Sequence, residues 1–267
     1  MGYDFHKNRT VYFEHQRLST QDYIIPFIEK HFRIDETLRV LEIGCGEGGV
    51  TKAFVEQGCI CTAVELSKNK FEKASQMLDE EIQKKRIELI NKNIYDPEFY
   101  SQFKNKFDLI ILKDVIEHII DQKKLLGYLY TFLRTDGIIF FSFPPWQMPF
   151  GGHQQMCKSI LKKTPWFHLL PTPLYKYTLK IMGESKGVQN GLIANKKTGI
   201  SIESFESYIN QIKYRVVEKK FYLFNPIYKF KFNLKPKEQL QLISLFPYLR
   251  NFLTTCVYYL VKAPAGN

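Results

Sequence analysis

The stretch "VLEIGCGEGG", residues 40–49, decides the fold of this 267-residue chain. Its apolar run predicts a buried strand, which then breaks into glycines. Glycine permits a positive φ and lets backbone N–H groups approach a ligand closely. Gly44, Gly46 and Gly49 satisfy the pattern G-x-G-x-x-G, which is a weak signal by itself because dinucleotide-binding proteins share it. The stretch therefore predicts a ligand-binding turn after the first strand of an α/β sheet.

Apolar strand-like segments alternate with helix-like segments on either side of this turn. Each parallel crossover needs a helix, and the strands are apolar enough for burial on both faces. The alternation predicts an α/β fold with a doubly wound, Rossmann-like sheet. The predicted strands are 38–44, 59–66, 87–94, 107–115, 137–145, 215–225 and 254–264, and the predicted helices are 19–33, 49–58, 67–86, 121–137, 201–214 and 235–252.

The chain is predicted to form one domain over residues 1–267, with residues 1–34 as an N-terminal helical cap. Its helix is expected to begin with Ser19 or Thr20 as the N-cap and to be kinked at Pro26. The alternation of strands and helices breaks over residues 145–200, which are rich in aromatic residues, lysine, proline and glycine. Only short helical pieces are apparent there. We interpret residues 145–200 as a mainly helical insertion after the fifth strand, placed to act as a lid.

Charge is unevenly distributed along the chain. The formal net charge is +11, yet residues 151–267 hold 18 lysines and arginines against 5 acidic residues. Such asymmetry favours an anionic partner for the second half, with solubility as the alternative. The polar start and the lack of a long apolar run favour a cytoplasmic location. Five scattered cysteines predict neither a disulfide framework nor a metal site, because Cys59 and Cys61 lack further ligands at suitable spacing.

Two acidic residues lie at strand ends near the glycine turn. Glu42 comes two residues before the turn, where its carboxylate could accept a hydrogen bond from a ligand ammonium or a loop amide. A pyrophosphate placed that close would be repelled. Glu65 ends the second strand, about 20 residues further on, where an acid can bind both ribose hydroxyls. Glu65 fits a nicotinamide cofactor or an adenosyl cofactor equally well.

These segments together resemble the class I S-adenosylmethionine-dependent methyltransferases. "VLEIGCGEGG" is similar to their first motif, "AVEL" to the segment with their ribose-binding acid, and "FDLIILKDVIEHI" to their fourth-strand motif. The "DVIEH" form is similar to small-molecule O-methyltransferases such as those of quinone biosynthesis. The resemblance covers residues 35–145 well and implies a seven-stranded sheet whose last strand is antiparallel.

The resemblance also implies a set of residues that bind S-adenosylmethionine. The glycine turn would line the methionyl part, and Glu42 would orient the turn or the amino group. Glu65 would hold the ribose and Leu66 would lie against adenine. Asn93 replaces the acid that is usual in the family, and its amide oxygen can still accept from the adenine amino group. The expected cofactor-binding residues are Glu42, Gly44, Cys45, Gly46, Gly48, Glu65, Leu66, Asn93, Ile94 and Lys113.

Methyl transfer to oxygen benefits from a base, and two histidines are the candidates. His118 follows the fourth strand in "DVIEH", and His153 follows the fifth strand after two glycines. Histidine titrates near neutral pH, so we expect one of the two to act as the catalytic base. The aromatic and basic residues of the insertion predict a small acceptor that is amphiphilic or anionic, with O-methylation favoured. The aromatic residues expected to wall the acceptor pocket are Trp146, Phe150, Trp166, Phe167, Tyr175 and Tyr177.

Other functions stay open from the sequence. The basic second half permits a nucleic-acid methyltransferase, although no separate RNA-binding module is apparent. The glycine turn also permits an NAD-dependent oxidoreductase or a non-catalytic nucleotide-binding module. The basic, aromatic-rich insertion could rest on a membrane surface. The acceptor and the oligomeric state are not predicted.

Overall fold

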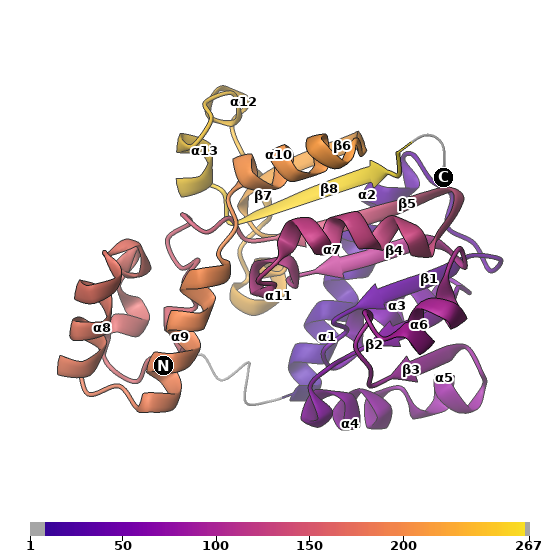
Figure 1. Cartoon of the computed structure of the whole chain (residues 1–267), viewed down its shortest axis with the longest axis horizontal. Helices are drawn as coiled ribbons and strands as arrows, with labels where there is room; N and C mark the ends of the chain where they lie inside the picture. The colour runs from indigo at the N-terminus through magenta and orange to yellow at the C-terminus, as the bar shows by residue number, and fades with distance from the viewer. Residues whose placement is uncertain (1–8, 265–267) are drawn as a thin grey trace.

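The computed structural model describes residues 9–264, which build an α/β fold around one eight-stranded sheet (Figure 1). The strand order is β3-β2-β1-β4-β5-β8-β6-β7. The first five strands are parallel, and β8 runs antiparallel between β5 and β6. The strands are β1 (Arg39–Ile43), β2 (Ile60–Val64), β3 (Ile87–Ile90), β4 (Phe107–Lys113), β5 (Leu133–Phe143), β6 (Arg215–Phe224), β7 (Lys237–Glu238) and β8 (Cys256–Lys262).

Helices cover both faces of the sheet, and the chain adds several short turns. In the described residues no helix is both long and apolar enough to cross a membrane. The helices are α1 (Arg9–Ser19), α2 (Ile25–Glu29), α3 (Gly49–Glu56), α4 (Lys68–Met77), α5 (Asp79–Gln83), α6 (Pro97–Phe103), α7 (Gln122–Leu129), α8 (Thr172–Ile181), α9 (Lys186–Thr198), α10 (Ile202–Ile212), α11 (Tyr228–Phe232), α12 (Gln241–Ser244) and α13 (Leu249–Phe252).

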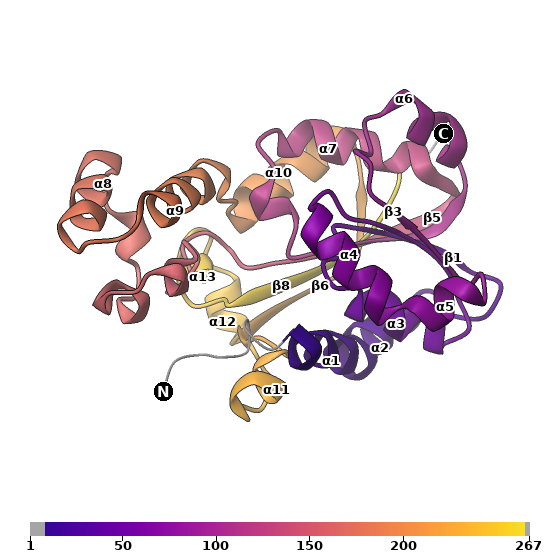
Figure 2. The ribbon, with the colours of Figure 1, turned by 90° about the horizontal axis from the view of Figure 1, so that it is seen from below.

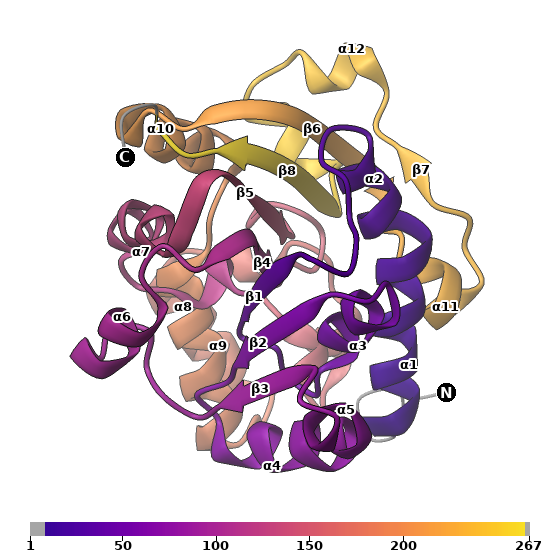
Figure 3. The ribbon, with the colours of Figure 1, turned by 90° about the vertical axis from the view of Figure 1, so that its right-hand side faces the viewer.

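Alternate residues of each central strand enter two separate cores. On one face, Leu41 and Ile110 pack with the apolar sides of α6, α7 and α10. On the other face, Val40 and Leu109 pack with α1, α2 and α3. Figure 3 shows these helix groups on opposite sides of the sheet. The strands are apolar throughout because both faces are covered, which confirms the doubly wound fold. The pairing of β8 with β5 and β6 confirms the antiparallel late strand.

The N-terminal helix was predicted from residue 19, but it begins ten residues earlier. Ser19 is not its cap, because this residue is buried in helical conformation at the end of α1. A π-helical turn, Thr20–Ile24, joins α1 to α2 and brings Pro26 into the first turn of α2. Proline is tolerated there because that N–H group needs no intrahelical partner. The proline that was expected to kink one helix therefore starts a second one.

Two other predicted helices are wrong in extent. The helix predicted over 121–137 ends at Leu129, and β5 already begins at Leu133. The helix predicted over 235–252 is replaced by the two-residue strand β7 and the short helices α12 and α13. Pro236 and Pro247 lie within that segment and break the helical pattern. β7 is an edge strand that adds to the seven that were predicted.

The insertion after β5 lies at the carboxyl ends of the parallel strands, where α8 and α9 project from the sheet (Figures 1 and 2). It has a small core of its own, formed by Cys157, Leu161, Phe167, Tyr175, Leu179 and Leu192. The insertion is therefore a packed helical layer that stands over the edge of the sheet where ligands bind in such folds.

Candidate active site

The glycine turn after β1 adopts the backbone that its sequence predicts. Gly44, Gly46 and Gly48 have φ values of +73°, +59° and +91°. A Cβ on Gly44 would lie 2.6 Å from a methyl group of Val115, so no side chain fits there. The amide of Gly44 donates to the carbonyl of Val64 (2.8 Å), which fastens the turn to the end of β2. The turn forms a backbone cradle without bulky side chains, and its contact with an adenosyl cofactor stays a prediction.

Glu65 links this turn to the next loop. One carboxylate oxygen accepts from the amide of Gly46 (3.0 Å) and the other from the amide of Ser67 (2.7 Å). Asn91, which the sequence analysis did not single out, donates to the backbone carbonyl of Glu65 (2.6 Å). Each carboxylate oxygen keeps a further lone pair. The carboxylate is thus held at the edge of the sheet, where it can still accept from ribose hydroxyls.

Glu42 faces the helix that follows the turn. It is buried and accepts a hydrogen bond from the hydroxyl of Thr51 on α3. Burial raises its pKa to about 7, an effect opposed by the Thr51 hydrogen bond and by the positive charge of Lys113. Its role toward the cofactor amino group stays a prediction. Cys45 is buried beside it, and burial also raises the thiol pKa, as befits a small packing residue.

The predicted adenine-binding residues lie around the loops after β2 and β3. Leu66 is exposed by 65%, so its apolar side chain is free to cover a ring. Ile94 is buried in the core. The side-chain oxygen of Asn93 accepts from the amide of Tyr95 (3.0 Å), a local turn that accounts for asparagine at this position. Contact of Leu66, Asn93 and Ile94 with adenine remains a prediction.

Lys113 ends β4 with a buried side chain. Its ammonium forms an ion pair with Asp114 (2.5 Å), which has a φ of +56°. Burial alone would lower the pKa of Lys113, but the negative charge of Asp114 next to it raises that pKa above its usual value. The side chain therefore brings a charge to the end of β4, and contact of Lys113 with the cofactor stays a prediction.

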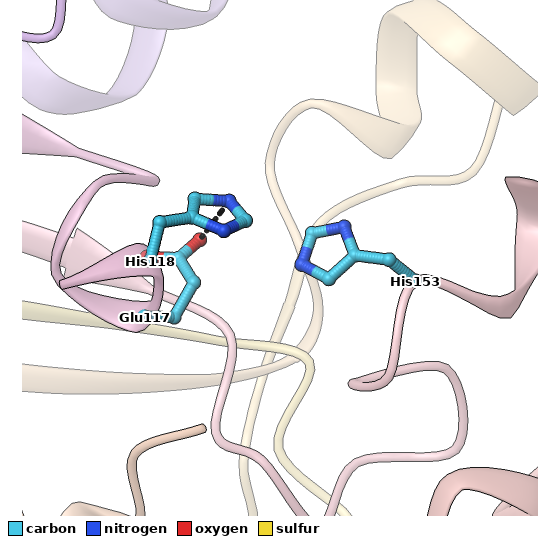
Figure 4. Close-up of side chains that lie close together, drawn as sticks. All are labelled: Glu117, His118 and His153. Carbon is cyan, nitrogen blue, oxygen red and sulfur yellow. Dashed lines mark ion pairs between the residues drawn. The ribbon is translucent and has the colours of Figure 1, made fainter. Parts of the chain in front are cut away.

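His118 and His153 are brought together, and Glu117 joins them (Figure 4). The two imidazole rings have centroids 5.0 Å apart, although 35 residues separate them in the chain. Glu117 and His118 lie on the 3₁₀ turn after β4, and His153 lies in the loop after β5 with a φ of +56°. Potential ligand atoms of all three residues lie within 4.8 Å of one another. The sequence analysis proposed the two histidines separately and assigned no role to Glu117.

Glu117 is the most unusual group of this site. Its side chain is 6% exposed, and neither carboxylate oxygen has a hydrogen-bond partner among the described residues. Burial, followed by the nearby charge of Asp114, raises its pKa well above the usual value. Burial lowers the pKa of His118, while a hydrogen bond with Asn195 opposes that effect. A carboxylate and two imidazoles at this spacing could also hold a divalent cation, for which the sequence provided no signal.

The lid helix α9 braces this turn. Thr198 donates its hydroxyl proton to the carbonyl of Glu117 (2.7 Å). The side-chain amide of Gln122 donates to the carbonyls of Ile116 (3.1 Å) and Thr198 (2.5 Å). A narrow recess with no room for a water molecule lies between the lid and the turn, and it is lined by Glu117, Pro144, Trp146, Gly151, His153, Asn195, Gly199 and Ile200.

Some aromatic residues of the lid lie at this recess, and others lie in the core of the lid itself. Trp146 lines the recess, and its ring packs edge-on against His168 with centroids 4.6 Å apart. Phe167 and Tyr175, which were expected to wall an acceptor pocket, are buried in the lid core instead. They were misplaced because aromatic residues predict burial without telling which core receives them.

Comparisons with known proteins agree with this geometry. Residues 12–169 match a family model described as "Methyltransferase domain". The ubiquinone biosynthesis O-methyltransferase of Histophilus somni is 26% identical over 135 residues, which are 47% of this chain and 55% of that protein. The mitochondrial one of Dictyostelium discoideum is 30% identical over 115 residues, 40% of this chain and 35% of that protein. The chain therefore spans about half or less of the length of these relatives.

A solved structure matches over nearly the whole chain. The S-adenosylmethionine-dependent methyltransferase from Clostridium acetobutylicum superposes with a TM-score of 0.55 at 15% identity, covering 93% of this chain and 92% of that one. This likeness supports the fold. Because the family model matches more than half of the chain, the protein belongs to the methyltransferase domain family.

Proposed function

We propose that this enzyme methylates a hydroxyl oxygen of a small acceptor that is amphiphilic or carries a negative charge. The observation that carries the proposal is the group of Glu117, His118 and His153 at the end of β4, beside the lid recess. This group supplies two imidazoles next to a buried carboxyl, in the part of the fold where an acceptor would meet the cofactor. The relatives named as O-methyltransferases support the choice of oxygen.

S-adenosylmethionine supplies a methyl group on a sulfonium, and the protein has to align the acceptor with it. Holding two reactants in line can lower the barrier by about 7–11 kcal/mol. His118 or His153 would take the hydroxyl proton as the oxygen bonds to the methyl carbon and the carbon–sulfur bond breaks. A base in this role contributes roughly 10²–10⁴ in rate. Glu117 would stabilise the imidazolium that forms.

Transfer of a radioactive methyl group from S-adenosylmethionine tests the proposal. A panel of phenols, hydroxy acids and amines would be offered to the wild-type enzyme and to His118→Ala and His153→Ala. We expect transfer to a hydroxyl acceptor, with the loss of one histidine reducing kcat by about 10²–10⁴ while S-adenosylhomocysteine affinity is retained. His31→Ala is the matched control, because His31 is paired with Glu218 on the surface. Transfer only to amines, or full activity in both variants, would contradict the proposal.

Peripheral membrane contact is part of the same proposal. The exposed side chains of α8 include Tyr177 and Ile181 beside Lys176 and Lys180. Apolar side chains flanked by lysines favour the surface of an anionic bilayer. We expect the protein to co-sediment with vesicles of phosphatidylglycerol and phosphatidylcholine at low salt. The nucleic-acid alternative predicts instead RNA binding whose affinity falls steeply with salt.

A further inference from the structure

A second lysine approaches the end of β4 from a distant part of the chain. Lys231 lies on α11, between β6 and β7, and its ammonium is 5.1 Å from the centroid of the Tyr12 ring on α1. The Tyr12 hydroxyl accepts from the side-chain amide of Gln16 (2.6 Å). Figures 2 and 3 show α1 and α11 side by side. The two helices thus bring a lysine and a tyrosine near the buried Lys113.

The charges of this cluster do not balance. Lys113 and Asp114 form one ion pair. Lys231 is half-buried and has no ion pair with any residue of the described chain from 9 to 264. Glu47, whose charge also acts on Tyr12, is already paired with Arg9. With Lys231 protonated, Lys113, Asp114 and Lys231 together therefore have a net charge of +1.

An excess charge in a half-buried place is costly unless a counter-ion is bound. Burial and the positive charge of Lys113 together lower the pKa of Lys231 to about 8, and the charge of Asp114 acts in the opposite direction. The Tyr12 ring offers a cation–π contact, but an aromatic ring does not neutralise the charge as a paired anion would. Lys229 on the same helix behaves differently, because it forms a surface ion pair with Asp22 (2.7 Å). Of these two lysines, only Lys231 lacks an anionic partner among the described residues.

We propose that Lys231 and Lys113 form a subsite for a carboxylate or phosphate group of the methyl acceptor, an inference that rests on the proposed methyl-transfer function. Lys113 is the last residue of β4, and Glu117 follows it by four residues. The subsite and the Glu117–His118–His153 group therefore begin at the end of one strand. Lys231 comes from the segment after β6, outside residues 12–169 that the family model matches. The glycine turn and Glu65 lie inside that range, which favours the acceptor over the cofactor as the source of the anion.

Sulfate is a suitable probe because it is a dianion that does not titrate near neutral pH. Full-length protein would first be saturated with S-adenosylhomocysteine, and sulfate would then be titrated at constant ionic strength with chloride as the balancing salt. Melting temperature and calorimetry give the affinity for wild type, Lys231→Met, Lys231→Arg and the matched control Lys229→Met. We expect at least a tenfold loss of sulfate affinity in Lys231→Met, and affinity within twofold of wild type in the other two variants. No specific sulfate binding by the wild type, or unchanged binding in Lys231→Met, would overturn the proposal.

A second titration separates the two sources of the anion. S-adenosylhomocysteine carries the methionyl carboxylate, whereas 5′-methylthioadenosine lacks it. If the acceptor uses the subsite, Lys231→Met binds both nucleosides as the wild type does. If Lys231→Met lowers the affinity for S-adenosylhomocysteine but not for 5′-methylthioadenosine, the anion belongs to the cofactor. The proposal of an acceptor subsite would then be wrong. Failure of the wild type to bind S-adenosylhomocysteine at all would instead contradict the methyltransferase function, so the two failures are distinguishable.

Discussion

Replacement of Glu42 by glutamine should change stability in a way that depends on pH. Folding raises the Glu42 pKa from 4.5 to about 7 because the carboxylate is removed from water. Between these values the folded state binds more protons than the unfolded state, so the Glu42 contribution to stability falls as pH rises through this window. Glutamine does not titrate and can still accept from Thr51. The variant should therefore gain stability relative to the wild type as pH increases.

The size of the effect follows from the two pKa values. The full difference corresponds to about 3 kcal/mol, most of which develops between pH 5 and pH 8.5. Urea unfolding of both proteins at these two pH values, followed by circular dichroism, measures it. All other titrating groups are common to both proteins and cancel in the comparison. A stability difference that is the same at both pH values, within about 0.5 kcal/mol, would refute the raised pKa.

The same variant tests the predicted contact with the cofactor amino group. If Glu42 binds this ammonium, S-adenosylhomocysteine affinity should rise with pH through about 7 in the wild type, because binding favours the charged carboxylate. The affinity of Glu42→Gln should be lower and nearly independent of pH over the same range. Calorimetry from pH 5.5 to 8 measures both. A parallel pH dependence in the two proteins would place the ammonium elsewhere.

Three further substitutions test the cradle, the lid and the core. Glu65→Gln keeps the size of the side chain but loses the charge that accepts from the Gly46 amide, so we expect about a 10- to 100-fold loss of S-adenosylhomocysteine affinity by calorimetry; an unchanged affinity would remove Glu65 from the site. Gly152→Ala would place a Cβ 2.1 Å from the Cβ of His168, so urea unfolding should show a loss of about 1–3 kcal/mol or a separate early transition of the lid. A single transition at the wild-type midpoint would contradict this packing. Leu126→Ala empties part of the core under α7 and should lower the free energy of unfolding by about 2–5 kcal/mol; a loss below 1 kcal/mol would mean that the core relaxes around it.

Local signals were sufficient for the cofactor half of the site. Gly44 and Gly46 need a positive φ, which only glycine adopts without strain, so their residue type alone predicts the turn. Glu65 comes at the end of the next strand, and parallel neighbouring strands end at the same edge. The position of Glu65 beside Gly46 was therefore predictable from the strand alternation.

Predictions failed where local propensity was weak or a neighbour decided the outcome. The start of α1 at Arg9 lacks an apolar pattern as clear as that of residues 19–33. α1 is instead held by contacts with the rest of the fold, such as the ion pair of Arg17 with Glu56. Residues 235–252 carry helix-forming residues, but Pro247 and the edge of β6 divide them between a strand and two short helices.

By itself, the sequence determined the parallel sheet, the glycine turn and the acid that serves it, because these depend on backbone sterics and on a periodicity that is read within one segment. Only the tertiary structure decided that Glu117, His118 and His153 meet, and that Lys231 of α11 lies over the ring of Tyr12 of α1. Such encounters depend on how separate elements of the fold are packed. No local pattern encodes them, because the contacts join residues that are 35 and 219 positions apart.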